Sequence, residues 1–143
     1  MMGLPRAIAH VFGSSVLLVA VLASGCGTST SPIDISAGEM LLYVSNQSFE
    51  DSPVDIRVTI DGAVVVDDRF SVGNQHDWVR HQLSLAPGEH RLRAESGMGV
   101  LFETTFTTPA DEALWAVLEY WWYPEEEARY FTFSTHDEPV EFY

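Results

Sequence analysis

The sequence contains no lysine, so its seven positively charged side chains are all arginine. Against them stand 21 aspartate and glutamate residues, which gives a formal net charge of −14. Nucleic-acid binding requires a clustered basic surface, and electrostatic adsorption to anionic lipid requires a polybasic patch. The charge balance therefore argues against both kinds of partner.

Cysteine is nearly absent, since Cys26 is the only one in 143 residues. A single cysteine excludes an internal disulfide framework and any zinc site built from several cysteines. The Gly-x-Ser-x-Gly motif that presents a nucleophilic serine is also missing. With 46% hydrophobic and 12% aromatic residues, however, the chain is too apolar for a disordered acidic polypeptide. Its length corresponds to one ordinary domain.

The N-terminus has the layout of a secretory signal. Arg6 is the only early positive side chain, an uncharged apolar stretch covers residues 11–22, and small residues follow. An uncleaved transmembrane anchor is the alternative, but a span needs about 20 apolar residues. This stretch is short and is interrupted by Gly13-Ser-Ser15. We therefore expect residues 1–25 to be a signal peptide, used by general secretion because no Arg-Arg pair is present.

Leu22-Ala-Ser-Gly-Cys26 follows the apolar stretch directly. This segment resembles the lipobox of bacterial lipoproteins, in which the cysteine sulfur receives a diacylglyceryl group and the signal is cut before the cysteine. The resemblance implies that Cys26 is the lipidation site, and that acyl chains such as palmitate hold the protein on a bacterial membrane, outside the cytoplasm. An ordinary buried thiol is the alternative, but Cys26 has only small and polar neighbours up to Pro32.

Residues 26–38 have the composition of a lipidated N-terminus followed by a flexible linker, because they are small, polar and interrupted by Pro32. At about 5–6 Å × √n, a dozen such residues hold a domain roughly 20 Å from its anchor. We assign the folded domain to residues 39–143.

From Glu39 onward, hydrophobic residues recur at every second position, as in strands with one buried face. Val54–Ile60 and Ala63–Phe70 flank Asp61-Gly62, a strong hairpin signal. Pro87-Gly88 predicts a second hairpin across Leu83–Ala94, with Leu92 and Ala94 inward and Arg91, Arg93 and Glu95 outward. Turn residues separate the other candidate strands, which cover residues 40–46, 78–85, 100–107 and 128–135.

Short strands at intervals of about ten residues predict an all-β fold, an antiparallel β-sandwich of seven to eight strands, immunoglobulin-like or similar. The Asp61-Gly62 turn and the Leu85–Leu92 segment are loosely similar to PEGA-type and other immunoglobulin-like extracytoplasmic modules of bacteria. This resemblance bears on the fold alone, because function does not follow from a sandwich architecture.

The segment Leu114–Tyr123 fits two structures. Thr108-Pro-Ala-Asp111 has the pattern of a helix start, and a helix after it would carry an apolar stripe. Its many aromatic residues favour a pleated surface instead, so we predict a strand. Because Glu119 cannot be buried cheaply without a partner, its side of the strand is assigned to the outer face. The inner set is Leu114, Ala116, Leu118, Tyr120 and Trp122, and the outer set is Trp115, Val117, Glu119, Trp121 and Tyr123.

Trp115, Trp121 and Tyr123 are therefore the candidate binding face. A row of partly exposed rings offers stacking for a sugar or a hot spot for a protein partner. Exposed aromatic stripes are rare on monomers, so the alternative is that a local helix or the Gly27–Gly38 tether covers these rings.

Metal-ligating side chains are present without the spacing of a metal site. His76-Asp77 and His136-Asp-Glu138 place ligand types side by side, but neighbouring strand residues face opposite ways. We expect His81 to be a packed or strand-edge residue and His90 to be solvated. Four acidic turns lack the pattern of a calcium loop and are expected to be solvated: Glu50-Asp51, Asp67-Asp68, Asp111-Glu112 and Glu125–Glu127. We expect no metal and no cofactor.

Together these features predict a non-catalytic, lipid-anchored extracytoplasmic module that binds or supports a component of the bacterial envelope. Its membrane contact is the lipid on Cys26, and its candidate partners are an envelope protein or a glycan. A carbohydrate-binding module that uses exposed aromatic residues is the first alternative. A small hydrolase or an enzyme accessory domain is the second.

Overall fold

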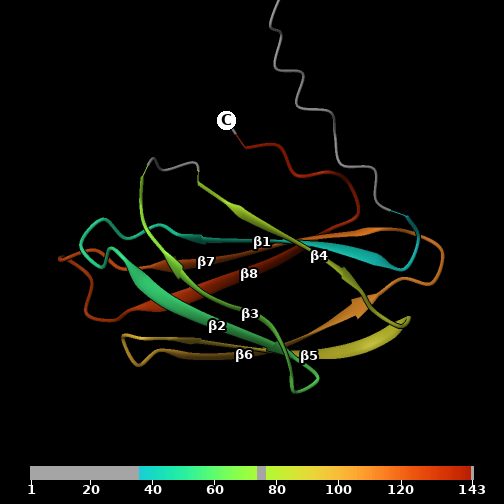
Figure 1. Ribbon diagram of the computed structural model, residues 1–143, viewed down its shortest axis with the longest axis horizontal. Coiled ribbons are helices and arrows are strands. Elements are labelled where there is room, and N and C mark those ends of the chain that lie inside the picture. Colours follow the sequence, from blue (N-terminus) through green and yellow to red (C-terminus); the bar gives the residue numbers. More distant parts are fainter. Residues whose placement is uncertain (1–35, 74–76, 143) are drawn as a thin grey trace, which may run out of the picture. The chain divides into compact units, whose positions relative to one another are not determined.

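A computed structural model of the chain describes residues 36–73 and 77–142, in which eight strands and no helix are found (Figure 1). The strands are β1 (Glu39–Asn46), β2 (Val54–Ile60), β3 (Ala63–Phe70), β4 (Val79–Ser84), β5 (Gly88–Ser96), β6 (Leu101–Thr108), β7 (Leu114–Trp121) and β8 (Tyr130–His136). The predicted signal peptide, Cys26 and most of the predicted linker lie outside the described residues. None of the described segments is a helix long and apolar enough to cross a membrane.

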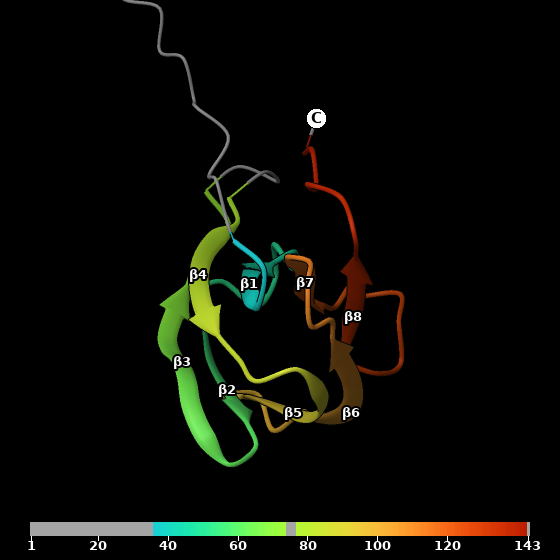
Figure 2. The same cartoon turned by 90° about the vertical axis from the view of Figure 1, so that its right-hand side faces the viewer.

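The strands form two sheets of four. Sheet A has the order β4-β1-β7-β8 and sheet B the order β3-β2-β5-β6. Neighbouring strands are antiparallel except for β1 and β7, which run parallel. On one side of the sandwich β3 approaches β4, and on the other β6 approaches β8 (Figure 2). The predicted all-β sandwich is confirmed.

The core lies between the two sheets and explains the period-two pattern. Val54, Ile56, Val58 and Ile60 of β2 are all buried, while Asp55 and Arg57 between them are exposed. β1 contributes Met40, Leu42 and Val44 to the same core, and β5 contributes Leu92 and Ala94. Full burial of one aliphatic side chain stabilises a fold by roughly 1.5–3 kcal/mol, so this alternation drives the pairing of the sheets.

The hairpin predicted at Asp61-Gly62 is confirmed. Ile60 pairs with Ala63 across a two-residue loop, in which Asp61 and Gly62 have φ of 50° and 81°. Two positive φ values are typical of a type I′ turn, whose twist matches that of the flanking strands. Asparagine, aspartate and glycine tolerate this conformation best, which explains the sequence of the turn.

The second predicted hairpin, across Leu83–Ala94, is wrong. β4 pairs with β1 in sheet A, whereas β5 pairs with β2 and β6 in sheet B. Pro87-Gly88 does reverse the chain, but a turn signal does not specify the partner of each strand. Here the turn connects β4 of sheet A to β5 of sheet B. The predicted facing of β5 is confirmed, because Leu92 and Ala94 are fully buried while Arg91 and Arg93 are exposed.

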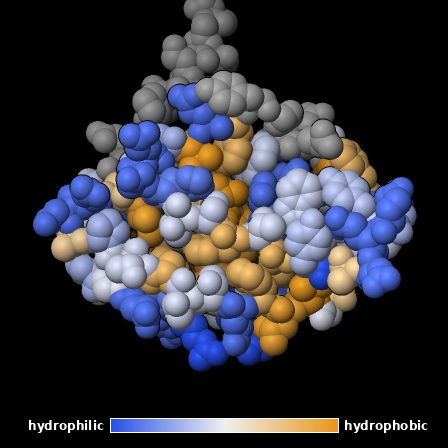
Figure 3. Space-filling model, turned by 180° about the vertical axis from the view of Figure 1, so that it is seen from behind, coloured by the Kyte–Doolittle hydropathy of each residue, from blue (hydrophilic) through white to orange (hydrophobic). Residues whose placement is uncertain are grey.

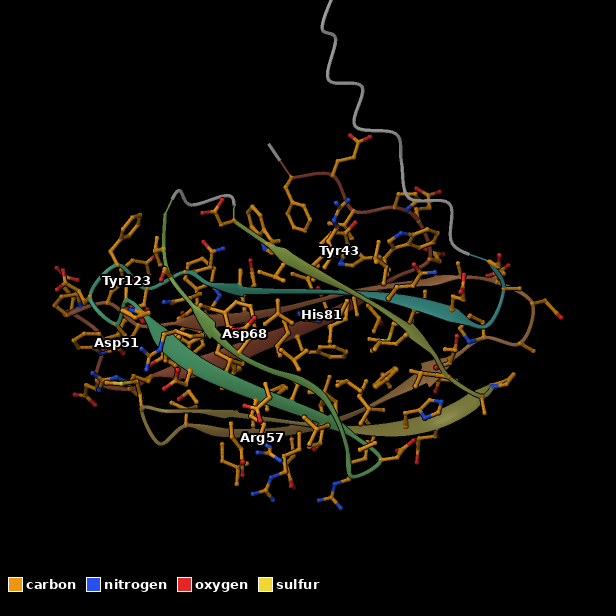
Figure 4. The ribbon with its side chains drawn as sticks, in the orientation of Figure 1. Tyr43, Asp51, Arg57, Asp68, His81 and Tyr123 are labelled. Atoms are coloured by element: carbon orange, nitrogen blue, oxygen red, sulfur yellow. The ribbon has the colours of Figure 1, made fainter. Side chains whose placement is uncertain are left out.

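The outer face of sheet B carries a row of ion pairs. Its ion pairs are Arg57–Asp67, Arg69–Asp55, Arg91–Glu103, Arg93–Glu95 and Arg93–Glu103. Figure 4 shows Arg57 on the solvent side of β2. Each exposed pair contributes little to stability, because both of its charges remain solvated. These ion pairs nevertheless involve four of the six arginines in residues 36–73 and 77–142. Most of the carboxylates that have no arginine partner therefore lie on other surfaces.

Candidate functional site

β7 presents its aromatic residues to both faces of sheet A, as the strand prediction requires. Leu114, Ala116, Leu118 and Tyr120 belong to the core. Trp115, Glu119 and Trp121 point to the other face and are partly buried. The outer face therefore carries the two tryptophans of the candidate binding face.

Trp122 departs from the prediction. β7 ends at Trp121, so the alternation stops there and Trp122 is partly exposed instead of joining the core. The guanidinium carbon of Arg129 lies 4.1 Å from the centre of its ring. This is a cation–π contact, an interaction in which the negative face of the ring attracts a positive charge.

The centre of the outer face is covered by the C-terminal segment. Leu41 and Val117 are buried although both point away from the core. The ring of Phe142 stacks on Trp78 at 4.0 Å and meets the edge of Tyr43 at 4.9 Å, measured between ring centres. In Figures 1 and 2 the C-terminal segment passes over sheet A on the side away from sheet B.

This cover differs from both segments considered in the sequence analysis. The part of the chain that the structure describes has no helix over these rings, and residues 27–35 of the tether lie outside it. Trp115, near the start of β7, is only half-buried.

The opposite end of β7 carries a group of three rings, which we call the aromatic cluster: Trp121, Tyr123 and Tyr130. Trp121 pairs with Tyr130 across the β7–β8 ladder, and the rings of Trp121 and Tyr123 are 6.0 Å apart and inclined by 44°. None of the three rings is buried, and Tyr130 is 38% exposed. The structure thus places two of the three predicted site residues together and adds Tyr130, whereas Trp115 lies toward the other end of the strand.

Hydrogen bonds connect Trp121 and Tyr130 to the acidic side chains beside them. The indole N–H of Trp121 donates to Thr132 Oγ1 at 3.3 Å, and Thr132 donates to Glu119 Oε2 at 3.3 Å. The Tyr130 hydroxyl donates to Glu126 Oε1 at 3.4 Å. Burial, helped by the nearby Glu126 carboxylate, raises the pKa of Tyr130 above its ordinary value.

Asp51 anchors this end of the sandwich. Arg129 donates to both of its carboxylate oxygens, at 2.6 and 3.1 Å, and the Tyr120 hydroxyl donates at 2.7 Å. The bond from Arg129 lowers the pKa of Asp51 although burial opposes it, and burial raises the pKa of Tyr120. Asn46 joins the same network by donating to the backbone oxygens of Asp51 and Phe70.

Asp51 was expected to be a solvated turn residue, and that expectation is wrong, since only 7% of its surface is exposed. The sequence gives little indication that Asp51 is buried, because it follows Glu50 in what looks like an acidic turn. Its partners Tyr120 and Arg129 lie 69 and 78 residues away, so only the folded chain reveals the network.

His90 was expected to be solvated and is instead 7% exposed. Its Nδ1 lies 2.6 Å from Asp61 Oδ2 and its Nε2 lies 2.7 Å from the carbonyl oxygen of Ala86. Both partners are acceptors, so both ring nitrogens donate, and the bond to Asp61 raises the pKa of His90 above its ordinary value. Beside it, between β5 and β6, is an open depression of about 520 Å³ whose charged lining includes Arg91 and Glu103, which already pair with each other.

Histidines and acidic residues do not converge in the described parts of the chain. No group of three or more His, Asp or Glu side chains among these residues could hold a metal ion. His81 is partly buried on edge strand β4, as expected, and burial lowers its pKa. Figure 4 shows it near Asp68, which belongs to edge strand β3 of the other sheet. His76 lies outside the described residues.

No protein-family model matches this chain, and no curated protein matches its sequence. The lipobox and PEGA-type resemblances therefore remain predictions from the sequence.

Proposed function

We propose that this protein is a non-catalytic, lipid-anchored extracytoplasmic β-sandwich that binds a component of the bacterial envelope. The observation that carries the proposal is the segment Leu22–Cys26, which places the only cysteine directly behind an apolar signal-like stretch. A short polar linker follows, and the first strand begins at Glu39. This order suits a folded module held close to a membrane by its N-terminus.

The aromatic cluster supports the binding role. Its rings are partly exposed and lie at one end of the sandwich, away from the segment that covers the centre of sheet A, and hydrogen bonds orient two of them, Trp121 and Tyr130. Rings held in place lose little conformational freedom on binding, which makes them effective contact residues.

The anchoring is tested by Cys26→Ser in a bacterial host fed a labelled fatty acid. The proposal expects the variant to lose the label and to leave the membrane fraction or accumulate unprocessed. Ser31→Ala in the same linker is the matched control and should keep both the label and the location. Persistent labelling of Cys26→Ser would show that the lipid, if any, is attached elsewhere.

A carbohydrate-binding module is the second candidate, favoured by the proximity of Trp121 and Tyr123. Replacing both residues with serine should then abolish co-sedimentation with insoluble chitin or peptidoglycan while the melting temperature changes little. A large loss of stability would instead show that the rings serve the fold.

A further inference from the structure

We infer that the aromatic cluster receives a positively charged arginine or lysine side chain from a basic partner protein. The inference rests on the proposed binding role of this surface and adds the chemical class of the occupant. Three observations support it: the arrangement of the rings, the state of the neighbouring carboxylates, and the charge of the molecule.

The rings do not form one flat platform. Trp121 and Tyr123 are inclined by 44°, and Tyr130 pairs with Trp121 from the next strand. A flat sugar ring stacks best on one planar surface, whereas a cation is attracted by the face of each ring around it. The same chain already uses this interaction once nearby, where Arg129 lies over Trp122.

The acidic side chains around the rings have unused acceptor capacity. Glu126 accepts from Tyr130 through Oε1, but its Oε2 is buried and has no hydrogen-bond partner among the described residues. The chain therefore does not fill the acceptor capacity of the Glu126 carboxylate, and a cationic donor is the strongest partner of a carboxylate. Glu119 is held beside Trp121 through Thr132, so the rings are flanked by two carboxylates.

The charge around the cluster is one-sided. Glu125 and Glu127 flank Glu126, and the nearby Arg129 is occupied by Asp51 and Trp122. Seen from behind, in Figure 3, this end lies on the right, where pale, weakly polar side chains border strongly hydrophilic ones. A net charge of −14 attracts a basic partner over a distance, and the rings then supply the contact.

The test is calorimetric titration of the full-length protein with an oligo-arginine peptide. The protein is held in a non-ionic polyoxyethylene detergent, because a zwitterionic or maltoside detergent would offer a competing cation or sugar. Glu119→Gln with Glu126→Gln keeps the side-chain shapes and removes the two charges, and should weaken binding about tenfold. Trp121→Leu should weaken it to a similar extent, with folding verified by thermal unfolding.

Glu125→Gln with Glu127→Gln is the control, since it removes the same amount of charge from the loop that holds Glu126 and should weaken binding less than about threefold. Equal losses in both pairs would reduce the effect to general electrostatics and overturn the inference. Absence of peptide binding would overturn it too, as would binding of a neutral chito-oligosaccharide in place of the peptide. None of these results affects the labelling of Cys26, so the failure of this inference is distinguishable from that of the lipid anchor.

Discussion

At the end of the sandwich that contains Tyr123, a few side chains hold the loops and strands together (Figure 4). Asp51 joins the loop after β1 to the last inward residue of β7 and to the segment that precedes β8. Arg129 reaches it from beside Trp122, so the same arginine neutralises a buried carboxylate and orders a ring next to the aromatic cluster. The stability of this end and the shape of the candidate site are thus set by the same contacts.

Asp51→Ala should lower the free energy of unfolding by about 3 kcal/mol, because Arg129 and the Tyr120 hydroxyl both lose their acceptor. Glu50→Ala removes a neighbouring exposed carboxylate and should change stability by less than about 0.5 kcal/mol. Urea unfolding of the two variants measures the difference. Similar small losses for both would contradict the role assigned to Asp51.

His90 gives the fold a pH dependence whose sign follows from its raised pKa. The protonated ring donates to Asp61 and Ala86, so its stabilising effect is complete below the pKa of the unfolded chain, about 6.5. It is lost as the pH rises through the higher pKa of the folded state. Stability should therefore fall above neutral pH more steeply in the native protein than in His90→Gln.

Thermal unfolding across pH 6–9 measures this slope. His136→Gln, which replaces an exposed histidine of β8 in the same way, is the matched control for the substitution. Parallel curves for the native protein and His90→Gln would contradict the assignment.

At the scale of the elements, the strands and their facing could be predicted, and the long-range pairing could not. Alternating residues identified β2, the Asp61-Gly62 turn identified β3, and aromatic content identified β7, because all three signals are local. The partner of β4 depends on which inner faces meet in the folded core, and no local signal specifies that. The pairing of β8 with β7 is different, because these strands are neighbours in the chain and the loop after Pro124 indicates a hairpin; this hairpin brings Tyr130 beside Trp121.

The packing of the C-terminal segment could not be predicted from the residue pattern. It has no regular structure to predict, yet Phe142 packs between Tyr43 and Trp78 and helps to cover the outer face of sheet A. The sequence shows only that an aromatic residue lies near a chain end. Its packing depends on Trp78 and Tyr43, which lie about 64 and 99 residues earlier in the chain.

Phe142→Ala should lower the free energy of unfolding by about 1–2 kcal/mol and expose Trp78 to solvent, because the stacked ring is lost. Glu138→Ala, in the same segment but exposed, should have no measurable effect. Quenching of tryptophan fluorescence by acrylamide, together with urea unfolding, distinguishes the two variants. Unchanged quenching in Phe142→Ala would show that the segment does not protect this face.

At the scale of the whole molecule, the distribution of charge bears on the proposed lipid anchoring. On the outer face of sheet B four arginines pair with four carboxylates, whereas the end with the aromatic cluster carries an excess of carboxylates. Under the proposed lipid anchoring, an anionic membrane surface repels the acidic domain, which keeps the candidate site accessible to a partner. The proposal therefore requires that a lipid, and not electrostatic attraction, attaches the protein to the membrane.

The intact mass of the protein purified from bacterial membranes tests that requirement most directly. The account predicts a chain that begins at Cys26, lacks residues 1–25, and carries the additional mass of a diacylglyceryl group. A chain that retains the N-terminal segment, or that begins at Cys26 without added mass, would contradict it.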